Sequence, residues 1–249
     1  MRMKTNGTVA SSGFDFTFCP VLEEMIQTGA TNGRSGKRYN QLGALSTSNN
    51  LHTLRQLQLR LKPRRTLEIG LSFGGSCLLF TASHREISRR AGRQHMALDP
   101  FQKEAWDDSG LLAVERAGLS DYLDFHPEFS SVALPRLVEK GAQFDLVYVD
   151  GSHLFEDVFV DAYYTSRLLP EGGIVAFDDC RDAHVQKVIR FIRQNLRQSL
   201  EEVDLAPFRN DQGRSARYRL ARLMGRTQMR AFRRIGTLSR PWNAPFNNF

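Results

Sequence analysis

The chain has 249 residues, of which 41% are hydrophobic and 24% are charged, and its net charge is +7. These proportions are typical of a folded globular protein and exclude a disordered, collagen-like or coiled-coil chain. The length fits one α/β domain or two small ones. No apolar run approaches the roughly 18 residues that a membrane span needs, so a bilayer is not the expected solvent.

The N-terminal residues and the cysteines indicate the compartment. Arg2 and Lys4 are followed by small and polar residues rather than by the apolar segment of a secretory signal. Cys19, Cys77 and Cys180 are odd in number and lack the spacing of metal sites. We therefore expect reduced, mostly buried thiols, no disulfide framework and a cytoplasmic location.

Positive charge is concentrated near the C-terminus, where residues 209–249 hold ten arginines against one acid, Asp211. Because the basic residues gather in one terminal segment and not over the whole fold, nucleic acid is not favoured as a partner. Residues 226–238 place three apolar side chains at helical spacing among arginines. This pattern predicts a helix that packs on its own domain or a solvated tail, and an anionic surface or a partner could also use it.

Two helices are predicted in the N-terminal part, after an arm of mostly small and polar residues at 1–17. Residues 18–29 form the first helix, which ends at Gly29, and residues 48–61 form the second, with Ser48 as its N-cap. The polar loop between them contains a Gly-Lys pair without the spacing of a phosphate-binding loop, which excludes a Walker site.

From residue 65 onward, short strand-like runs alternate with segments of helix length. This alternation is typical of a parallel sheet with helices on both faces. Residues 200–206 and 216–223 are predicted to form a hairpin at the sheet edge, with an antiparallel last strand. The strands predicted before this hairpin are residues 66–70, 95–99, 122–126, 144–150 and 172–179.

Polar or flexible residues stand at the ends of these strands. In an open α/β sheet, ligands bind beyond the carboxyl ends of the strands, so function is expected at this edge. Asp is also common in turns, which would explain any one of these residues alone but less readily the whole set. The residues are Glu68, Gly70, Asp99, His126, Asp150, Asp178 and Asp179.

The turn after the first strand has the character of a ligand-binding loop. Gly70 lets the chain turn, and Gly74 and Gly75 allow a ligand to approach the backbone at a helix start. Ser72 stands where the second glycine of G-x-G-x-x-G belongs, which disfavours pyrophosphate binding. Asp99 ends the next strand, where a carboxylate can accept both hydroxyls of an adenosine ribose. An adenosine cofactor is therefore predicted, with a capping aspartate as the alternative.

Together these motifs resemble the class I S-adenosylmethionine-dependent methyltransferases. The resemblance is to metal-dependent small-molecule O-methyltransferases, similar to the catechol and macrolide-sugar enzymes, and covers about residues 65–225. The elements that carry it are E-x-G-x-x-x-G-x-S from Glu68 to Ser76, ALDPF with Asp99, FDLVYVDGSH at 144–153 and LLPEGGIVAFDD at 168–179.

The resemblance implies a doubly wound, seven-stranded, mostly parallel sheet with strand order 3-2-1-4-5-7-6, an antiparallel last strand and an N-terminal helical cap. It divides the chain into three regions. Residues 1–62 would form the arm, the helices and a substrate-side loop, residues 63–224 the methyltransferase core, and residues 225–249 a basic C-terminal tail.

The resemblance also implies an S-adenosylmethionine site, residue by residue. Glu68 and the turn from Gly70 to Ser76 would face the methionine part of the cofactor, and Asp99 would hold the ribose. Phe101 would lie by the adenine, which Ser130 and Ser131 would border from the other side. The cofactor-binding residues implied in this way are Glu68, Gly70, Ser72, Gly74, Ser76, Asp99, Phe101, Ser130 and Ser131.

Three acids match the metal ligands of the family: Asp150, Asp178 and Asp179. Brought together, these carboxylates would raise one another's pKa unless a cation lay between them. Oxygen ligands favour Mg²⁺ or another hard divalent cation, and such an ion lowers the pKa of a bound hydroxyl. Asp150 would therefore serve catalysis as a metal ligand.

His153 matches the general base of the sugar branch. An imidazole with an unperturbed pKa of about 6.5 suits this role, and a supporting or capping role at the turn is the alternative. Three nearby acids, Asp157, Asp161 and Asp182, are expected at the surface, as caps or outside the ligand shell.

The acceptor is expected to be a small molecule with a hydroxyl, either a sugar of a natural product or glycan, or a phenol. The Asp-Asp pair and His153 favour the sugar. The loop at 34–48 is expected to approach the acceptor, with Tyr39, Asn40 and Gln41 as candidate walls. The sequence is compatible with a monomer and with a homo-oligomer.

Three other functions compete. A nicotinamide-dependent oxidoreductase would share the strand pattern but needs the glycine that Ser72 replaces. A hydroxylase-associated relative could keep the acidic cluster without transferring a methyl group. A non-catalytic cofactor-binding protein could act through its basic tail.

Overall fold

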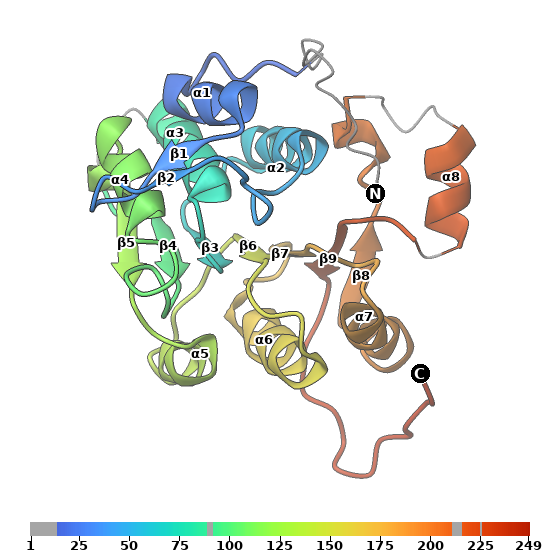
Figure 1. Cartoon of the computed structure of the whole chain (residues 1–249). Helices are drawn as coiled ribbons and strands as arrows, with labels where there is room; N and C mark the ends of the chain where they lie inside the picture. The colour runs from blue at the N-terminus through green and yellow to red at the C-terminus, as the bar shows by residue number, and fades with distance from the viewer. Residues whose placement is uncertain (1–13, 89–91, 211–215, 225) are drawn as a thin grey trace.

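One seven-stranded sheet organises the computed structural model, which describes residues 14–88, 92–210, 216–224 and 226–249 (Figure 1). Its strand order is β5-β4-β3-β6-β7-β9-β8, and β9 runs antiparallel to both of its neighbours. The predicted order 3-2-1-4-5-7-6 is therefore confirmed. The strands are β3 (Thr66–Ile69), β4 (His95–Leu98), β5 (Leu123–His126), β6 (Leu146–Val149), β7 (Ile174–Phe177), β8 (Leu200–Val203) and β9 (Arg230–Arg234).

Helices cover both faces of this sheet, and each face has its own core (Figure 1). One core joins the sheet to α1 (Pro20–Thr28), α2 (Ser48–Leu61), α3 (Gly75–Ser88) and α4 (Ser109–Arg116). The other joins it to α5 (Ser130–Glu139), α6 (Phe155–Leu168) and α7 (Ala183–Asn195). The remaining elements are β1 (Thr31–Asn32), β2 (Arg38–Tyr39), η1 (Ser120–Tyr122), η2 (Ala206–Phe208) and α8 (Ala216–Leu223).

The central strands β6 and β7 are apolar because both of their faces are covered. Every residue of both strands is buried. Alternate side chains enter opposite cores, so that Leu146 and Tyr148 face α3 while Val147 and Val149 face α6. This packing fixes the register of β6, and with it the direction of the chain as it leaves the strand at Asp150.

The N-terminal helices begin and end close to the predicted residues. α1 ends at Gly29, which adopts a left-handed conformation with φ of +63°. The N-cap of α2 is Thr47 and not Ser48, because the Thr47 side chain accepts a hydrogen bond from the backbone N–H of Asn50 at 3.2 Å. Residues 1–13 of the predicted arm lie outside the described part, and Phe16 is buried in the core beside α2.

The C-terminal hairpin differs from the predicted one. Residues 216–223, predicted as a strand, form helix α8, and the partner of β8 is β9, which lies within the segment predicted as a helix or solvated tail. Apolar residues three apart suit a helix, but Phe232 and Ala231 point into opposite cores, as strand residues do. Pairing also brings Arg233 opposite Glu201. These tertiary contacts outweigh the local periodicity.

Two predictions about solvent and redox state can be compared with the structure. Cys19, Cys77 and Cys180 are all buried free thiols, as predicted. Within the described ranges, no helix combines the length and the apolar character needed to cross a membrane.

The role of β9 in the sheet can be tested by truncating its buried aromatic side chain. Phe232 is 1% exposed and contacts the Phe177 ring, with 6.3 Å between ring centroids. We expect Phe232→Ala to lower the free energy of unfolding by about 3 to 5 kcal/mol, measured by urea denaturation. The control is Phe246→Ala at a 64% exposed position, for which we expect a change within about 0.5 kcal/mol. If the two substitutions lowered the free energy of unfolding equally, the placement of Phe232 in a buried strand would be contradicted.

Candidate active site

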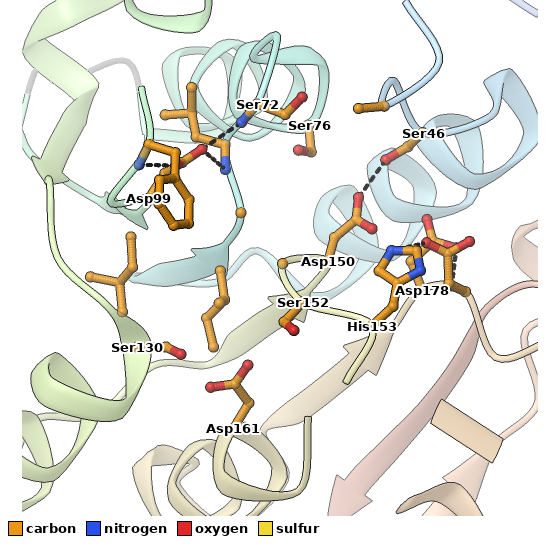
Figure 2. A pocket seen from close by; sticks show the side chains of 18 of the residues that line it. Ser46, Ser72, Ser76, Asp99, Ser130, Asp150, Ser152, His153, Asp161 and Asp178 are labelled. Atoms are coloured by element: carbon orange, nitrogen blue, oxygen red, sulfur yellow. Dashed lines mark hydrogen bonds and ion pairs between the residues drawn. The ribbon is translucent and has the colours of Figure 1, made fainter. Parts of the chain in front are cut away.

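A cavity of about 800 Å³ opens beyond the carboxyl ends of β3, β4, β6 and β7. Its walls come from the ends of these strands, the starts of α3, α5 and α6, and the loop before α2 (Figure 2). Most of the predicted site residues line this cavity: Gly70, Ser72, Ser76, Asp99, Phe101, Ser130, Ser131, Asp150, His153, Asp178 and Asp179. Two predicted residues, Glu68 and Gly74, are not among the lining residues.

The glycine loop after β3 is shaped by close backbone contacts. Gly70 has φ of +89°, and a Cβ atom there would lie 2.3 Å from the carbonyl oxygen of Asp150. Gly74 has φ of +84°, and its Cβ would lie 2.9 Å from the Cα of Gly110 in α4. These glycines therefore let the loop pack on neighbouring backbone. Ser72 adopts φ of +48°, a conformation that is strained for a serine.

Asp99 holds this loop in place. Its Oδ2 accepts hydrogen bonds from the backbone N–H of Leu71 at 3.1 Å and of Ser72 at 2.8 Å, and from the Gln102 amide at 3.0 Å. Its Oδ1 accepts from the N–H of Phe101 at 2.8 Å. A carboxylate has about four lone-pair sites, so Oδ1 retains capacity for a ligand hydroxyl. Asp99 thus acts as a cap and still faces the cavity.

Two aromatic rings stand beside Asp99 at the cavity wall. Phe101 and Phe129 are 50% and 55% exposed, and their rings meet edge to face with centroids 5.5 Å apart. Ser130 and Ser131 follow at the start of α5 and line the same part of the cavity. Exposed aromatic faces next to hydroxyl groups suit a flat ring with polar edges.

Glu68 lies behind the loop, contrary to the predicted contact with a cofactor. Its side chain is fully buried, with Oε1 at 3.3 Å from His95 Nε2. Burial and the neighbouring Glu68 carboxylate raise the pKa of the Cys77 thiol well above its ordinary value, so the thiol keeps its proton. Thr66 and Glu68, which alternate along β3, interact with His84 and Cys77 of α3, so Glu68 points toward α3 and not toward the cavity.

At the opposite end of the cavity, Asp150 meets groups from the N-terminal region. Ser46 donates to Asp150 Oδ2 at 2.9 Å, and the Ser46 oxygen lies 3.0 Å from the Tyr148 hydroxyl. Burial raises the pKa of Asp150 well above its ordinary range, and the charges of Asp178 and Asp179 raise it further. The carboxyl group is therefore in an environment that favours neutralisation, by a proton or by a cation.

Asp178 is the most fully hydrogen-bonded of the three acids. The buried amide of Asn50 donates to its Oδ1 at 2.8 Å and to its Oδ2 at 3.0 Å. The Tyr148 hydroxyl donates to Oδ2, and the backbone N–H of Asp179 donates to Oδ1 at 2.7 Å. Burial raises the pKa of Asp178, although these donors oppose the shift.

Asp179 connects the acids to His153. The imidazole Nε2 lies 3.0 Å from Asp179 Oδ2, and the Gln228 amide donates to Asp179 Oδ1. Asp179 has φ of +48°, which is uncommon for a residue other than glycine. His153 is about half exposed and also lines the cavity. The geometry therefore brings a carboxylate and an imidazole together where a ligand can reach both.

The carboxylates of Asp150, Asp178 and Asp179 are farther apart than the ligands of one metal ion. Among the described residues, the grouping whose ligand atoms all lie within 4.8 Å of one another is Glu68, Cys77 and His95, inside the core. Asp150, Asp178 and Asp179 line one cavity, and the charges of Asp178 and Asp179 raise the pKa of Asp150. Their ligand atoms, however, do not all lie within 4.8 Å of one another. The buried grouping does not suit a cation, because its thiol keeps its proton, whereas the three aspartates share a cavity that is open to solvent.

Sequence reasoning missed several side chains of the site. Ser46 and Asn50 bind the acids from the loop before α2 and from its first turn, and Gln228 does so from the residues before β9. Asp161, expected outside the site, is 1% exposed and lines the cavity, as does Asp157. A usable signal existed for Asp161, because the sequence spacing places it on the same helical face as the apolar residues Val158 and Ala162.

Only part of the loop predicted to approach the acceptor lines the cavity. Residues 43–47 line the cavity, whereas Tyr39, Asn40 and Gln41 do not. Tyr39 instead packs against the Phe73 ring, with 5.3 Å between centroids, and Asn40 accepts a hydrogen bond from Arg38. The short β1–β2 hairpin keeps these residues away from the strand ends.

Comparison with known proteins finds similarity to methyltransferases. Residues 67–180 match the Methyltransf_24 family, described as a methyltransferase domain. Caffeoyl-CoA O-methyltransferase 1 of Eucalyptus globulus is 28% identical over 154 residues, which cover 56% of this chain and 58% of that protein. The Eucalyptus gunnii caffeoyl-CoA O-methyltransferase is also 28% identical, with 56% and 57% covered. The match thus spans less than two thirds of the length of these curated relatives.

Solved structures share the fold over more of the chain. The O-methyltransferase TomG from Streptomyces achromogenes, solved with S-adenosylmethionine, is 18% identical with a TM-score of 0.59, and 89% of this chain and 91% of that chain are covered. The Bacillus cereus O-methyltransferase, solved with S-adenosylhomocysteine, is 21% identical with a TM-score of 0.55, and 74% and 82% are covered. The strand order agrees with these structures, residues 67–180 are similar to a methyltransferase domain, and the predicted resemblance to the O-methyltransferases is confirmed.

Proposed function

We propose that this protein transfers a methyl group from S-adenosylmethionine to a hydroxyl of a small molecule, with the help of Mg²⁺ or another divalent cation. The observation that carries the proposal is that one cavity has two chemically different ends. Asp99, Phe101 and Ser130 line one end, and Asp150, Asp179 and His153 line the other. Methyl transfer to oxygen needs a site for the donor and a group that takes a proton from the acceptor.

The donor would lie along the glycine loop. S-adenosylmethionine supplies a methyl group bonded to a positively charged sulfur. Gly70, Ser72 and Ser76 would border its amino-acid part, and the remaining lone pair of Asp99 would accept from the ribose. Phe101, Ser130 and Ser131 would border the adenine. Glu68 and Gly74 would act indirectly, by supporting the loop from behind.

The acidic end suits a hard divalent cation by its donor set. Asp150, Asp178 and Asp179 offer only carboxylate oxygens, and their mutual repulsion is of the kind that a cation relieves. A bound divalent cation would lower the pKa of an acceptor hydroxyl. The side chains of Ser46, Asn50 and Gln228 hold these carboxylates and so would limit how they can rearrange around an ion.

His153 would take the proton from the acceptor. Its Nε2 faces the Asp179 carboxylate, which fixes the ring orientation and leaves Nδ1 as the ring nitrogen that can accept a proton. The same carboxylate stabilises the imidazolium that results. Because His153 is about half exposed, the proton can then pass to solvent.

The acceptor would enter beside residues 43–47, which flank the acidic end. The Asp178–Asp179 pair with His153 matches the sugar branch of the family and favours a sugar hydroxyl over a phenol. The cytoplasmic location and the oligomeric state stay predictions.

The competing functions are less well supported by the geometry. The residue at the second glycine of a dinucleotide loop is Ser72, whose side chain would crowd a pyrophosphate. The tail contributes β9 to the sheet, where Arg230 binds Glu202 at 2.6 Å and is buried. Part of the predicted tail is therefore a structural element of the fold, which disfavours a function that uses the whole tail to bind a partner.

The first test removes one acid at a time. We expect Asp150→Asn and Asp179→Asn to lower kcat by at least about 100-fold and to abolish stimulation by Mg²⁺, because both variants remove a negative ligand. Affinity for S-adenosylhomocysteine, measured by calorimetry without metal, should stay within about threefold of the wild type. Asp121→Asn, an exposed acid before β5, is the control. Unchanged turnover in both variants would refute the metal role.

The second test acts on the other end of the cavity. We expect Asp99→Asn to weaken S-adenosylhomocysteine binding by about tenfold or more, because it loses the ribose acceptor and weakens the bonds to Leu71 and Ser72. The Mg²⁺ dependence of the remaining activity should be unchanged. A variant that keeps its cofactor affinity but loses its Mg²⁺ dependence would show that the two ends have been assigned the wrong way round.

The third test concerns the proton acceptor. We expect His153→Gln to lower kcat by about 100-fold to 10,000-fold while cofactor affinity is retained. In the wild type, kcat should fall on the acidic side of the pH profile, and the variant should lose that acidic limb. An acidic limb that persists in the variant would assign the base to another group.

A further inference from the structure

Asp161 is a buried acid that the proposed chemistry leaves without a role. It lies in α6, one helix turn beyond Asp157, and it is only 1% exposed although it lines the cavity. Its Oδ1 has no hydrogen-bond partner among the described residues. A buried carboxyl oxygen without a partner costs free energy, and the residue that carries this one lines a cavity that a ligand can fill.

The surroundings of Asp161 shift the pKa of its carboxyl group toward neutral pH. Burial raises its pKa to about 7, a hydrogen bond from Ser130 lowers the pKa, and the charge of Asp157 raises it. Asp157 has its own partner, since the Ser152 hydroxyl donates to it at 2.7 Å. A carboxyl group that carries its proton has one donor and one free acceptor, whereas an ionised one only accepts.

Figure 2 shows where Asp161 lies in the cavity. Asp161 on α6 and Ser130 on α5 lie close together at one end, while Asp150, His153 and Asp178 lie together at the other. Phe101 and Phe129, whose rings meet edge to face, also line the cavity, and Phe129 directly precedes Ser130. Asp161 therefore lies closer to the side proposed for the nucleoside base than Asp150 and Asp178 do.

We propose that Asp161 determines specificity for the base of the cofactor, by pairing its carboxyl group with the amino group and the adjacent ring nitrogen of adenine. The inference rests on the proposed S-adenosylmethionine site. One oxygen of the protonated carboxyl accepts from the exocyclic N–H, and the O–H donates to the ring nitrogen. The pattern is the one by which an Asn or Gln amide, also one donor and one acceptor, pairs with adenine. Ser130 lies beside the carboxyl group.

This pairing links cofactor binding to the proton on Asp161. The complex requires the protonated form, so affinity is highest at low pH and falls as the pH rises through about 7, where the free carboxyl ionises. Of the groups packed around Asp161, Asp157 from α6 carries charge, and Ser130 from α5 contributes a neutral hydroxyl. Binding at neutral pH is accordingly accompanied by proton uptake.

The experiment is calorimetric titration with two ligands, S-adenosylhomocysteine and its 6-deamino analogue, which lacks the amino group of the base. It compares the wild type with Asp161→Leu, Asp161→Asn and the control Glu156→Gln, an exposed acid on the same helix. The wild type and the control should bind the analogue about tenfold more weakly than S-adenosylhomocysteine. Asp161→Leu should bind both ligands with similar, weakened affinity, because the protein group that reads the amino group is gone.

Asp161→Asn provides the second readout, because its amide keeps a donor and an acceptor at every pH. Between about pH 6 and about pH 8, the wild type should lose affinity and take up protons on binding, while Asp161→Asn should do neither. Discrimination against the analogue that is unchanged in a folded Asp161→Leu, or a wild-type affinity without pH dependence, would overturn the inference alone. A wild type that binds neither ligand would overturn the proposed function as well.

Discussion

The parallel direction of β3, β4, β6 and β7 is the constraint on which the site depends. Because these strands run the same way, the chain leaves all of them at one edge, and residues as distant in sequence as Gly70 and Asp178 reach one cavity. The same arrangement buries the carboxyl groups of Asp150 and Asp178, which follow β6 and β7. Burial then raises the pKa of Asp150 and Asp178, so the chemistry of the edge follows from its topology.

The core strands and the polar residues at their ends could be predicted from the sequence, because the spacing of apolar residues and the positions that follow each strand indicate them. The strands of the core are short apolar runs bounded by polar residues, and the glycine loop, Asp99 and the Asp178–Asp179 pair follow them directly. These signals are local. The prediction of 216–223 and 226–238 was wrong for a corresponding reason: the spacing of Phe232 fits a helix, and only the cross-strand partners on β8 decide in favour of a strand.

The parts of the site that sequence reasoning missed depend on distant contacts. Nothing near Ser46 or Asn50 indicates that they will bind carboxylates more than 100 positions away. Glu68 shows the reverse case, since its motif position implied a ligand contact but the alternation of β3 directs it into the core. Motif position therefore identified a loop that reaches the cavity, while the direction of each side chain required the fold.

The hydrogen bonds from Ser46 and Asn50 have an evolutionary consequence. Both residues precede residues 67–180, which match the methyltransferase family model, so the conformation of the acids depends on a region outside that segment. The residues proposed to bind the donor, Asp99, Phe101 and Ser130, lie inside it. Changes in the leading region could therefore reshape the acidic end of the cavity without altering the residues proposed for the donor.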